Sequence, residues 1–266
     1  MLAKEAIDRC MSAMQEYRTS GLSIREIGKK YNIPRPFLSG FMLANGIDIY
    51  SRKSHVNNLL FEHIDSEEKA YWLGFLYADG SICKFAKSYK IELTLKESDV
   101  EHLIKFKNFL GLPKNPAYRT TQKAYRVTFG SRKMAEDLIK LGCTQKKSLT
   151  LKFPTKVPEE LLKHFIRGYF DGDGCLTIRH SKQAEVADVS VLGTFEFLTS
   201  LCKHLNLENK TVKKDSRSTT NVCCVRFNKK EGYVFLHYIY DDASIYLQRK
   251  YDKYKICRAF EQSEVL

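Results

Sequence analysis

Short segments of alternating apolar and polar residues recur along this chain, and each is followed by a segment with helical periodicity. Residues 90–96 alternate with a period of two, which predicts a β-strand with one apolar and one polar face. Residues 100–110 then repeat apolar positions at the spacing of an amphipathic helix. The same succession returns at residues 188–192 and 195–205, and further strands are predicted at residues 125–129 and 224–227. This order predicts an α+β fold with two similar halves, each built on an antiparallel sheet.

Two apolar stretches, Trp72–Gly80 and Ile166–Gly174, share a second pattern: two small residues four positions apart, followed at once by Asp-Gly. Small residues at this spacing lie on one face of a helix, so two such helices can pack almost backbone to backbone. Asp79 and Asp173 would then lie close together, and we expect the glycine after each acid to leave the helix in a left-handed conformation. Neighbouring carboxylates repel each other unless a cation binds between them, so the pattern predicts a divalent-metal site.

Both stretches resemble the LAGLIDADG motif of homing endonucleases, in the form that carries two motifs in one chain. With its flanks the resemblance covers roughly residues 63–266. In that family the eighth motif position is the metal-binding catalytic acid, which corresponds to Asp79 and Asp173. The sixth position, which is not the metal ligand in the family, is Tyr77 in the first copy and Asp171 in the second. No role is assigned to the main chain at position 78.

The resemblance implies two pseudo-symmetric αββαββα lobes that form a saddle over DNA. It also implies a site-specific endonuclease that hydrolyses one phosphodiester per strand with Mg²⁺, or Mn²⁺, held by the two motif aspartates. Family enzymes also tend to place a basic residue near each scissile phosphate. An alignment of the segments that follow the two lobes pairs Lys147 with Lys250 as the catalytic candidates. A role as phosphate clamps stays open for both, and Lys146 and Arg249 are alternatives.

Polar side chains follow one face of the predicted strands in each half. In the first half these are Lys90, Glu92, Thr94, Lys96, Arg126 and Thr128, and in the second half they are Arg179 and Arg226. Rows of long polar side chains on a curved sheet suit the major groove of DNA, whereas an ordinary solvated face is the alternative for any single strand. Because the two halves differ in sequence, we expect a long asymmetric target. The chain is expected to act as a monomeric pseudo-dimer on double-stranded DNA.

The sequence of the N-terminal segment predicts three helices. The first covers residues 3–17, a short second one begins at the capping box formed by Ser23 and Glu26, and the third covers residues 36–45. This unit resembles the helix-turn-helix domains of resolvases and small regulators, which would place Arg35, Ser39 and Asn45 on or near a recognition helix. A small helical cap packed on the first lobe is the alternative. We therefore divide the chain into a helix-turn-helix domain (1–48), a basic polar linker that follows the DNA backbone (49–62), a first lobe (63–155) and a second lobe (156–266).

Composition agrees with a nucleic-acid partner. The 266 residues include 44 Lys and Arg against 31 Asp and Glu, a formal net charge of +13, and 43% are hydrophobic. Such charge indicates a polyanionic partner, or else lysines on solvated faces. No apolar run approaches the length of a membrane span and no signal peptide opens the chain, so we expect a cytoplasmic protein of a bacterium or a phage-infected cell. The eight cysteines show no metal-binding spacing and are expected to be reduced thiols. His63 and His164 are expected on helix surfaces.

Two other functions are compatible with the same fold. A non-catalytic DNA-binding transcriptional regulator would have lost cleavage, and the presence of both motif acids argues against it. An RNA-splicing maturase would use the same basic surface on structured RNA, and this alternative stays open.

Overall fold

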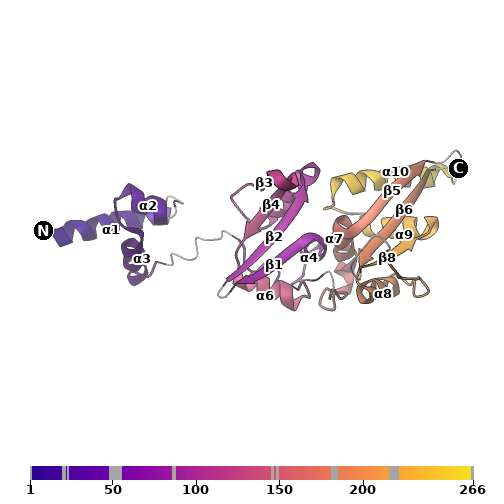
Figure 1. Cartoon of the computed structure of the whole chain (residues 1–266), viewed down its shortest axis with the longest axis horizontal. Helices are drawn as coiled ribbons and strands as arrows, with labels where there is room; N and C mark the ends of the chain where they lie inside the picture. The colour runs from indigo at the N-terminus through magenta and orange to yellow at the C-terminus, as the bar shows by residue number, and fades with distance from the viewer. Residues whose placement is uncertain are drawn as a thin grey trace. The chain divides into compact units, whose positions relative to one another are not determined.

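The computed structural model describes residues 2–19, 22, 24–47, 56–85, 88–144, 147, 150–180, 185–215 and 222–264 (Figure 1). It divides into two compact units, Met1–His55 and Val56–Leu266, and each has its own hydrophobic core. Some predicted features lie outside the described residues: Ser23 of the capping box, positions 49–55 of the linker, and Lys146. None of the described helices combines the length and the apolar character needed to cross a membrane.

The N-terminal unit contains three helices that agree with the prediction: α1 (Leu2–Thr19), α2 (Ile24–Lys30) and α3 (Arg35–Ala44). Between α2 and α3 the chain turns through Asn32, whose φ of 50° is left-handed. Ile33 N donates to Gly28 O at 2.8 Å in this turn. A Cβ atom on Gly28 would lie 2.8 Å from Ile33 O, so the turn requires glycine there. Buried residues from all three helices form the core of this unit, among them Cys10, Ala13, Tyr17, Ile27, Leu38 and Met42.

The first half of the larger unit has the order αββαββα. Its elements are α4 (Glu67–Asp79), β1 (Gly80–Phe85), β2 (Ser88–Lys96), α5 (Val100–Phe109), β3 (Ala117–Arg119), β4 (Ala124–Phe129) and α6 (Arg132–Lys140), with 3₁₀ turns at Glu97–Asp99 and Thr120–Gln122. The strands form an antiparallel sheet in the order β1-β2-β4-β3.

The second half repeats this order and adds one helix. Its elements are the 3₁₀ turn Glu159–Leu161, α7 (Leu162–Asp173), β5 (Gly174–His180), β6 (Glu185–Gly193), α8 (Phe195–His204), β7 (Lys213–Lys214), β8 (Cys223–Phe227), α9 (Lys229–Tyr240) and α10 (Gln248–Glu264). The sheet order β5-β6-β8-β7 matches that of the first half. The predicted α+β fold with two αββαββα halves is therefore confirmed.

The helices α4 and α7 pack against each other between the two sheets (Figure 1). A Cβ atom on Gly74 would lie 2.0 Å from Phe165 O, and one on Gly168 would lie 2.0 Å from Tyr71 O. Real atoms do not approach so closely, so the two backbones touch where the sequence places its small residues. The predicted backbone-to-backbone packing is confirmed, and this helix pair joins the two halves.

The expected left-handed exit of the two motif helices is wrong. Gly80 has φ −70° and ψ 153°, and Gly174 has φ −83° and ψ 155°, which are extended conformations open to any residue. The reason for glycine is steric instead. A Cβ atom on Gly80 would lie 2.6 Å from Leu76 O, and one on Gly174 would lie 2.5 Å from Phe170 O. Each chain turns directly from its helix into a strand, and a side chain at the turn would collide with the last helical turn.

Candidate active site and nucleic-acid interface

The two motif acids meet at the ends of the paired helices. Asp79 is the last residue of α4 and Asp173 is the last residue of α7. A Cβ atom on Gly172 would lie 2.2 Å from the Cβ of Ala78 and 3.3 Å from Asp79 Oδ2, so the last turns of the two helices are in contact. Asp79 is exposed and Asp173 is partly buried. The close packing of the helices therefore brings one carboxylate from each half to a shared, accessible position.

The surroundings of the two acids raise the pKa of both carboxyl groups. Burial, followed by the negative charge of Asp79, raises the pKa of Asp173 to about 6, while Lys147 and Lys250 act in the opposite direction. Asp79 remains in contact with solvent, but partial desolvation by the surrounding protein raises the pKa of its carboxyl. The positive charges of Lys147, Lys250 and Arg249 act in the opposite direction. Two carboxylates that repel each other in a partly enclosed site form a donor set suited to a hard divalent cation.

The structure brings the two candidate lysines to equivalent positions beside the acids. Lys147 Nζ donates to the carbonyl oxygen of Gly80, and Lys250 Nζ donates to the carbonyl oxygen of Gly174. Each glycine directly follows a motif acid, so the alignment of the two lysines agrees with the pseudo-symmetry of the structure. The alternative Arg249 is bound elsewhere, because its Nε lies 3.1 Å from the carboxylate of the buried Asp99.

Lys250 is held more completely than a surface lysine. Its side chain is 3% exposed, and its ammonium also donates to Phe170 O and to Asp171 O, the latter at 3.0 Å. Burial lowers the pKa of Lys250 to about 8, although the nearby acids Asp171 and Asp79 counteract this effect. Lys147 is only partly buried.

The sixth motif position is enclosed in both copies, as the resemblance implies for a residue that is not a metal ligand. The carboxylate of Asp171 is buried and accepts hydrogen bonds from Tyr71 Oη at 2.8 Å, from Tyr240 Oη at 2.5 Å and from Leu247 N at 2.7 Å. In the first copy Tyr77 Oη donates to Leu141 O. The residue at this position therefore connects its motif helix to the chain just after α6 in the first half, and to the end of α9 and the chain that leads into α10 in the second.

His63 is exposed as expected, although it lies in a bend before α4 and not on a helix, whereas the expectation for His164 is wrong. His164 is buried beside Arg167, with 3.0 Å between His164 Nδ1 and Arg167 Nη2. Burial lowers its pKa to about 4. The physical reason is the central position of α7, whose sides are covered by α4, α9 and the second sheet. A helix with no solvent face hides residues that an amphipathic pattern would expose.

The six polar residues predicted on the first sheet share one face. The strand register pairs Glu92 with Thr128 and Thr94 with Arg126, while the alternating Ile91, Leu93 and Leu95 point into the core. Glu92 lies at the centre of this face, and it contacts Arg126 at 2.8 Å, Thr128 at 3.2 Å and Lys90 at 3.3 Å. Arg119 also belongs to this face and was missed by the sequence analysis. It pairs in register with Ala124, which in turn pairs with Lys96, and directly paired residues lie on the same face of a sheet.

The second sheet carries a comparable polar face. Arg179 forms an ion pair with Asp188 on the neighbouring strand, and Arg226 pairs in register with Ser190. Beside Arg226, a pocket with a volume of about 690 Å³ extends along β7 and is lined by Asn209, Lys210, Thr211, Lys213, Lys214, Asp215, Cys224, Arg226 and Glu231. Lys213 and Lys214 were missed because β7 is too short to show a strand pattern.

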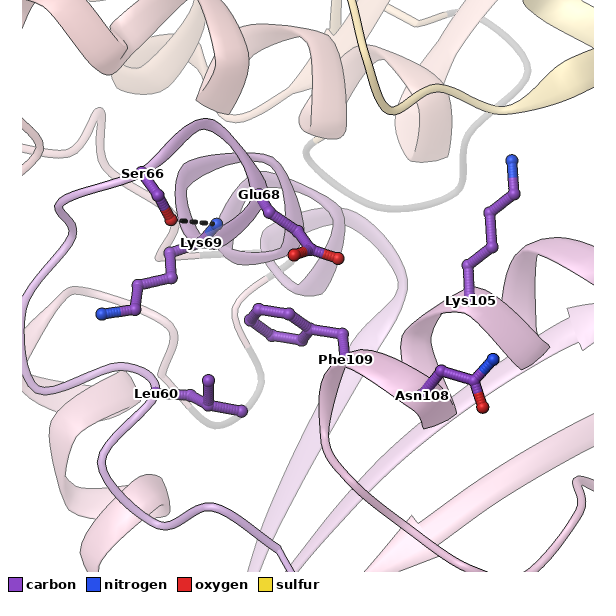
Figure 2. Close-up of a pocket in the computed structure, with 7 residues that line it drawn as sticks. All are labelled: Leu60, Ser66, Glu68, Lys69, Lys105, Asn108 and Phe109. Carbon is purple, nitrogen blue, oxygen red and sulfur yellow. Dashed lines mark hydrogen bonds between the residues drawn. The ribbon is translucent and has the colours of Figure 1, made fainter.

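A different pocket lies at the far end of the central helix pair and involves none of the predicted site residues. Its volume is about 590 Å³, and Figure 2 shows Leu60, Ser66, Glu68, Lys69, Lys105, Asn108 and Phe109 lining it. Ser66 caps the start of α4, with its hydroxyl accepting from Lys69 N at 3.4 Å. Asp79 ends the same helix about 18 Å along its axis. This pocket is therefore separate from the acids.

The candidate metal site consists of the two motif acids alone. No group of three or more His, Cys, Asp or Glu residues that could hold a metal occurs in the part of the chain that the structure describes. The described part of the chain would thus supply two carboxylates to a divalent cation.

In the N-terminal unit, the three predicted contact residues lie on α3 or at its end. Arg35 is exposed in the first turn and Ser39 is partly covered. Asn45 caps the end of the helix, because its side-chain amide donates to Phe41 O at 2.8 Å.

No family model matches this sequence, and no curated protein resembles it in sequence. Solved structures do match. The LAGLIDADG meganuclease I-AabMI, bound to uncleaved DNA, is 12% identical, with a TM-score of 0.52 over 76% of this chain and 92% of that one. The I-LtrWI LAGLIDADG homing endonuclease, bound to target DNA, is 14% identical, with a TM-score of 0.50 over 74% and 92%. The LAGLIDADG homing endonuclease I-GzeII, in complex with its DNA target, is 12% identical, with a TM-score of 0.50 over 74% and 92%. This chain has the fold of LAGLIDADG homing endonucleases.

Proposed function

We propose that this protein is a site-specific double-strand DNA endonuclease that hydrolyses one phosphodiester per strand at a long asymmetric target. The observation that carries the proposal is the meeting of Asp79 and Asp173 at the ends of the paired helices, each beside the glycine that a lysine contacts. The similar structures bound to DNA support the proposed substrate.

Asp79 and Asp173 are the residues that would hold Mg²⁺ or Mn²⁺. When bound, such a cation lowers the pKa of a coordinated water and stabilises charge on phosphate oxygens. The chain itself positions the two carboxylates through the α4–α7 contact. It also brings the positive charges of Lys147 and Lys250 close enough to counteract part of the rise in the pKa of both acids. Each half thus contributes one acid and one lysine, and two such pairs would suffice to cut the two DNA strands once each.

The polar faces of the two sheets would bind the major groove on either side of the cut. Lys90, Thr94, Lys96, Arg126 and Thr128 would contact bases or phosphates in the first half, as would Arg179 and Arg226 in the second. Glu92 orients Arg126 and Lys90 through ion pairs, and it is suited to accept a hydrogen bond from cytosine. The sequences of the two faces differ, so one chain would act as a pseudo-dimer on an asymmetric site.

The N-terminal unit would extend the DNA contact beyond the saddle. Its two helices joined by a short turn have the order of a helix-turn-helix, and α3 would lie in a major groove with Arg35 and Ser39 near the bases. Of the predicted linker, only the residues before Val56 would follow the phosphate backbone between the two sites, because Val56 and Phe61 belong to the core of the larger unit. Because residues 56–266 have their own core, removal of the first unit should shorten the DNA footprint and leave cleavage in place.

The test is cleavage of a large randomised duplex library by the full chain, with sequencing of both the bound and the cut molecules. The reactions contain Mg²⁺ or Ca²⁺, and a parallel set uses the Asp79→Asn, Asp173→Asn double variant. Cuts with Mg²⁺ at one recurrent long site, absent in the variant, are the expected result. Specific binding without cuts would contradict the endonuclease and favour a DNA-binding regulator.

A further inference from the structure

The outward face of α3 is apolar. Phe37 is 58% exposed and Leu43 is 45% exposed, while Leu38 and Met42 are buried on the opposite side of the helix. Pro36, Gly40 and Ala44 are also exposed on the outward face, and a Cβ atom on Gly40 would meet nothing within 4 Å. Ser39, which is partly covered, is thus the one hydrogen-bonding side chain near the centre of α3, and the exposed residues around it are apolar.

The same unit also carries exposed cationic side chains. Arg25 and Lys29 on α2 and Arg35 at the start of α3 are all exposed. These positive charges favour a polyanion over an apolar protein surface as the partner of this unit. In the major groove of DNA, the C5-methyl group of thymine is the apolar feature that a side chain such as phenylalanine can contact.

We propose that Phe37 and Leu43 on α3 read thymine methyl groups, so that the N-terminal unit selects A·T pairs by apolar contact. This inference rests on the proposed DNA binding of that unit. Its phosphate contacts would come from Arg25, Lys29 and Arg35, and these position the helix without reading the sequence.

The test compares an alternating A·T duplex with the same duplex in which uracil replaces thymine, so that only the methyl groups differ. The full chain and its Phe37→Ala variant are titrated on both duplexes in EDTA, which prevents cleavage. Burial of one methyl group corresponds to about a fourfold change in affinity. We expect the full chain to bind the uracil duplex at least that much more weakly, and Phe37→Ala to lose most of this difference.

The control is Ile7→Ala, which removes a side chain of similar exposure, 53%, from α1 of the same unit. It should keep the full difference between the two duplexes. If the full chain binds both duplexes equally while Arg35→Glu weakens both, the unit binds DNA but does not read methyl groups, and the inference is wrong. If neither Arg35→Glu nor Phe37→Ala changes binding, the N-terminal unit does not contact DNA and that part of the proposed function fails.

A second, independent inference concerns Lys250. A lysine ammonium carries three N–H donors, and here three carbonyl oxygens accept from it: those of Phe170, Asp171 and Gly174. The side chain is almost completely buried. Its donors are thus occupied by the protein, whereas Lys147, within the described part of the chain, has one protein acceptor, Gly80 O.

The three carbonyls enclose the second motif acid. Phe170 and Asp171 belong to the last turn of α7, and Gly174 begins β5, so the ammonium holds the chain on both sides of Asp173. Lys250 is itself fixed, because Leu247 N at the start of its helix donates to the carboxylate of Asp171 at 2.7 Å. We infer that Lys250 is a positioning residue that sets the place of the Asp173 carboxylate for metal, and that it does not donate to DNA. This inference specifies a role within the proposed active site.

The test replaces Lys250 by Met in the full chain. Its matched control is Lys253→Met, one turn further along α10, because Lys253 Nζ donates to Leu176 O at 2.9 Å on the same strand but beyond the acid. Mn²⁺ binding to the protein alone is followed by electron paramagnetic resonance of the free ion. Loss of a group that orients a metal ligand weakens metal affinity by about tenfold or more. We expect that loss in Lys250→Met, and no comparable loss in Lys253→Met.

Cleavage provides a second measurement at temperatures well below the melting point of each variant. A positioning role predicts a higher Mn²⁺ concentration at half-saturation and recovery of the rate at saturating Mn²⁺. A rate that stays low at saturation, with Mn²⁺ binding unchanged, would show direct participation and overturn the inference. Equal losses in both lysine variants would also overturn it. If the protein cuts no DNA, the Mn²⁺ titration still decides the role of Lys250.

Discussion

Arg167 Nη2 lies 2.5 Å from Glu67 Oε1, and this ion pair joins the middle of α7 to the first turn of α4. Arg167 is fully buried, and it also donates to Ile239 O and Ile245 O, each at 2.8 Å. The same Glu67 oxygen accepts from Ser244 N at 2.9 Å. One guanidinium thus connects the two motif helices with the chain that leads into α10, the helix that carries Lys250.

We expect Arg167→Met to lower the free energy of unfolding by about 3–5 kcal/mol, because it removes the donor to the carbonyls of Ile239 and Ile245 and the charged partner of the partly buried Glu67 carboxylate. Urea unfolding followed by circular dichroism measures the change. The control is Lys152→Met, whose partner Glu196 lies 3.1 Å away on the surface. An exposed pair contributes about 0–1 kcal/mol, so equal effects of the two variants would contradict the structural role of Arg167.

Gly74→Ala should destabilise the protein, because the added methyl group would overlap the main chain of Phe165 and push the two halves apart. We expect a loss of at least about 1–3 kcal/mol, as for an overpacked core, together with a loss of cleavage. Gly40→Ala is the matched control, since its Cβ atom would lie in open space on a helix. That variant should gain about 0.4–1 kcal/mol in thermal or urea unfolding. A stable Gly74→Ala protein would show that the helices are further apart than described.

The sequence predicted the elements and the two acids well for a physical reason. Strands such as residues 90–96 have one buried face, so their alternation is visible, and the small residues of the motif mark a helix contact directly. Arg167 and His164 could not be assigned in this way, because α7 is buried on all sides and periodicity does not distinguish a buried ion pair from a surface residue. A lone arginine inside an otherwise apolar run was the available signal. The extended conformation of Gly80 arises because β1 begins at this residue. The rule that predicts a left-handed glycine at a helix end considers the helix alone and not the strand that follows it.

Asp173 should make stability depend on pH and on metal. Its pKa in the folded protein, about 6, lies above the ordinary value for an aspartate, so the folded state binds this proton more tightly than the unfolded state does. Stability therefore falls as the pH rises from the ordinary aspartate pKa to about 6, and the loss is complete above that pH. Asp173→Asn should raise the melting temperature at pH 7.5 in EDTA, and the gain should largely disappear at pH 4. Mg²⁺ should raise the melting temperature of the unmodified protein more than that of the variant. A variant that melts lower at pH 7.5 would contradict this account.

The single variants Asp79→Asn and Asp173→Asn should each abolish cleavage of at least one strand. The amide keeps the size of the carboxyl group but loses the charge that a divalent cation requires. Binding should be largely intact, because the sheet faces are unchanged. A supercoiled plasmid that carries the selected target separates nicked from linear product, and a gel-shift assay with Ca²⁺ measures binding. Undiminished double-strand cutting by either variant would remove that aspartate from the active site.

Lys147 is the better candidate for direct contact with the scissile phosphate or its attacking water. It is partly exposed and lies beside the motif acids, where its charge counteracts part of the rise in the pKa of both Asp79 and Asp173. Lys147→Met should slow cleavage of one strand by about 10²-fold at saturating protein and saturating Mg²⁺, as expected for the loss of one charged group that stabilises a transition state. Strand-specific end labels in single-turnover reactions measure the two cuts separately. Lys147→Arg keeps the charge and should retain more of the rate than Met does. Unchanged rates in Lys147→Met would leave Lys147 as a residue that only fixes the carbonyl of Gly80.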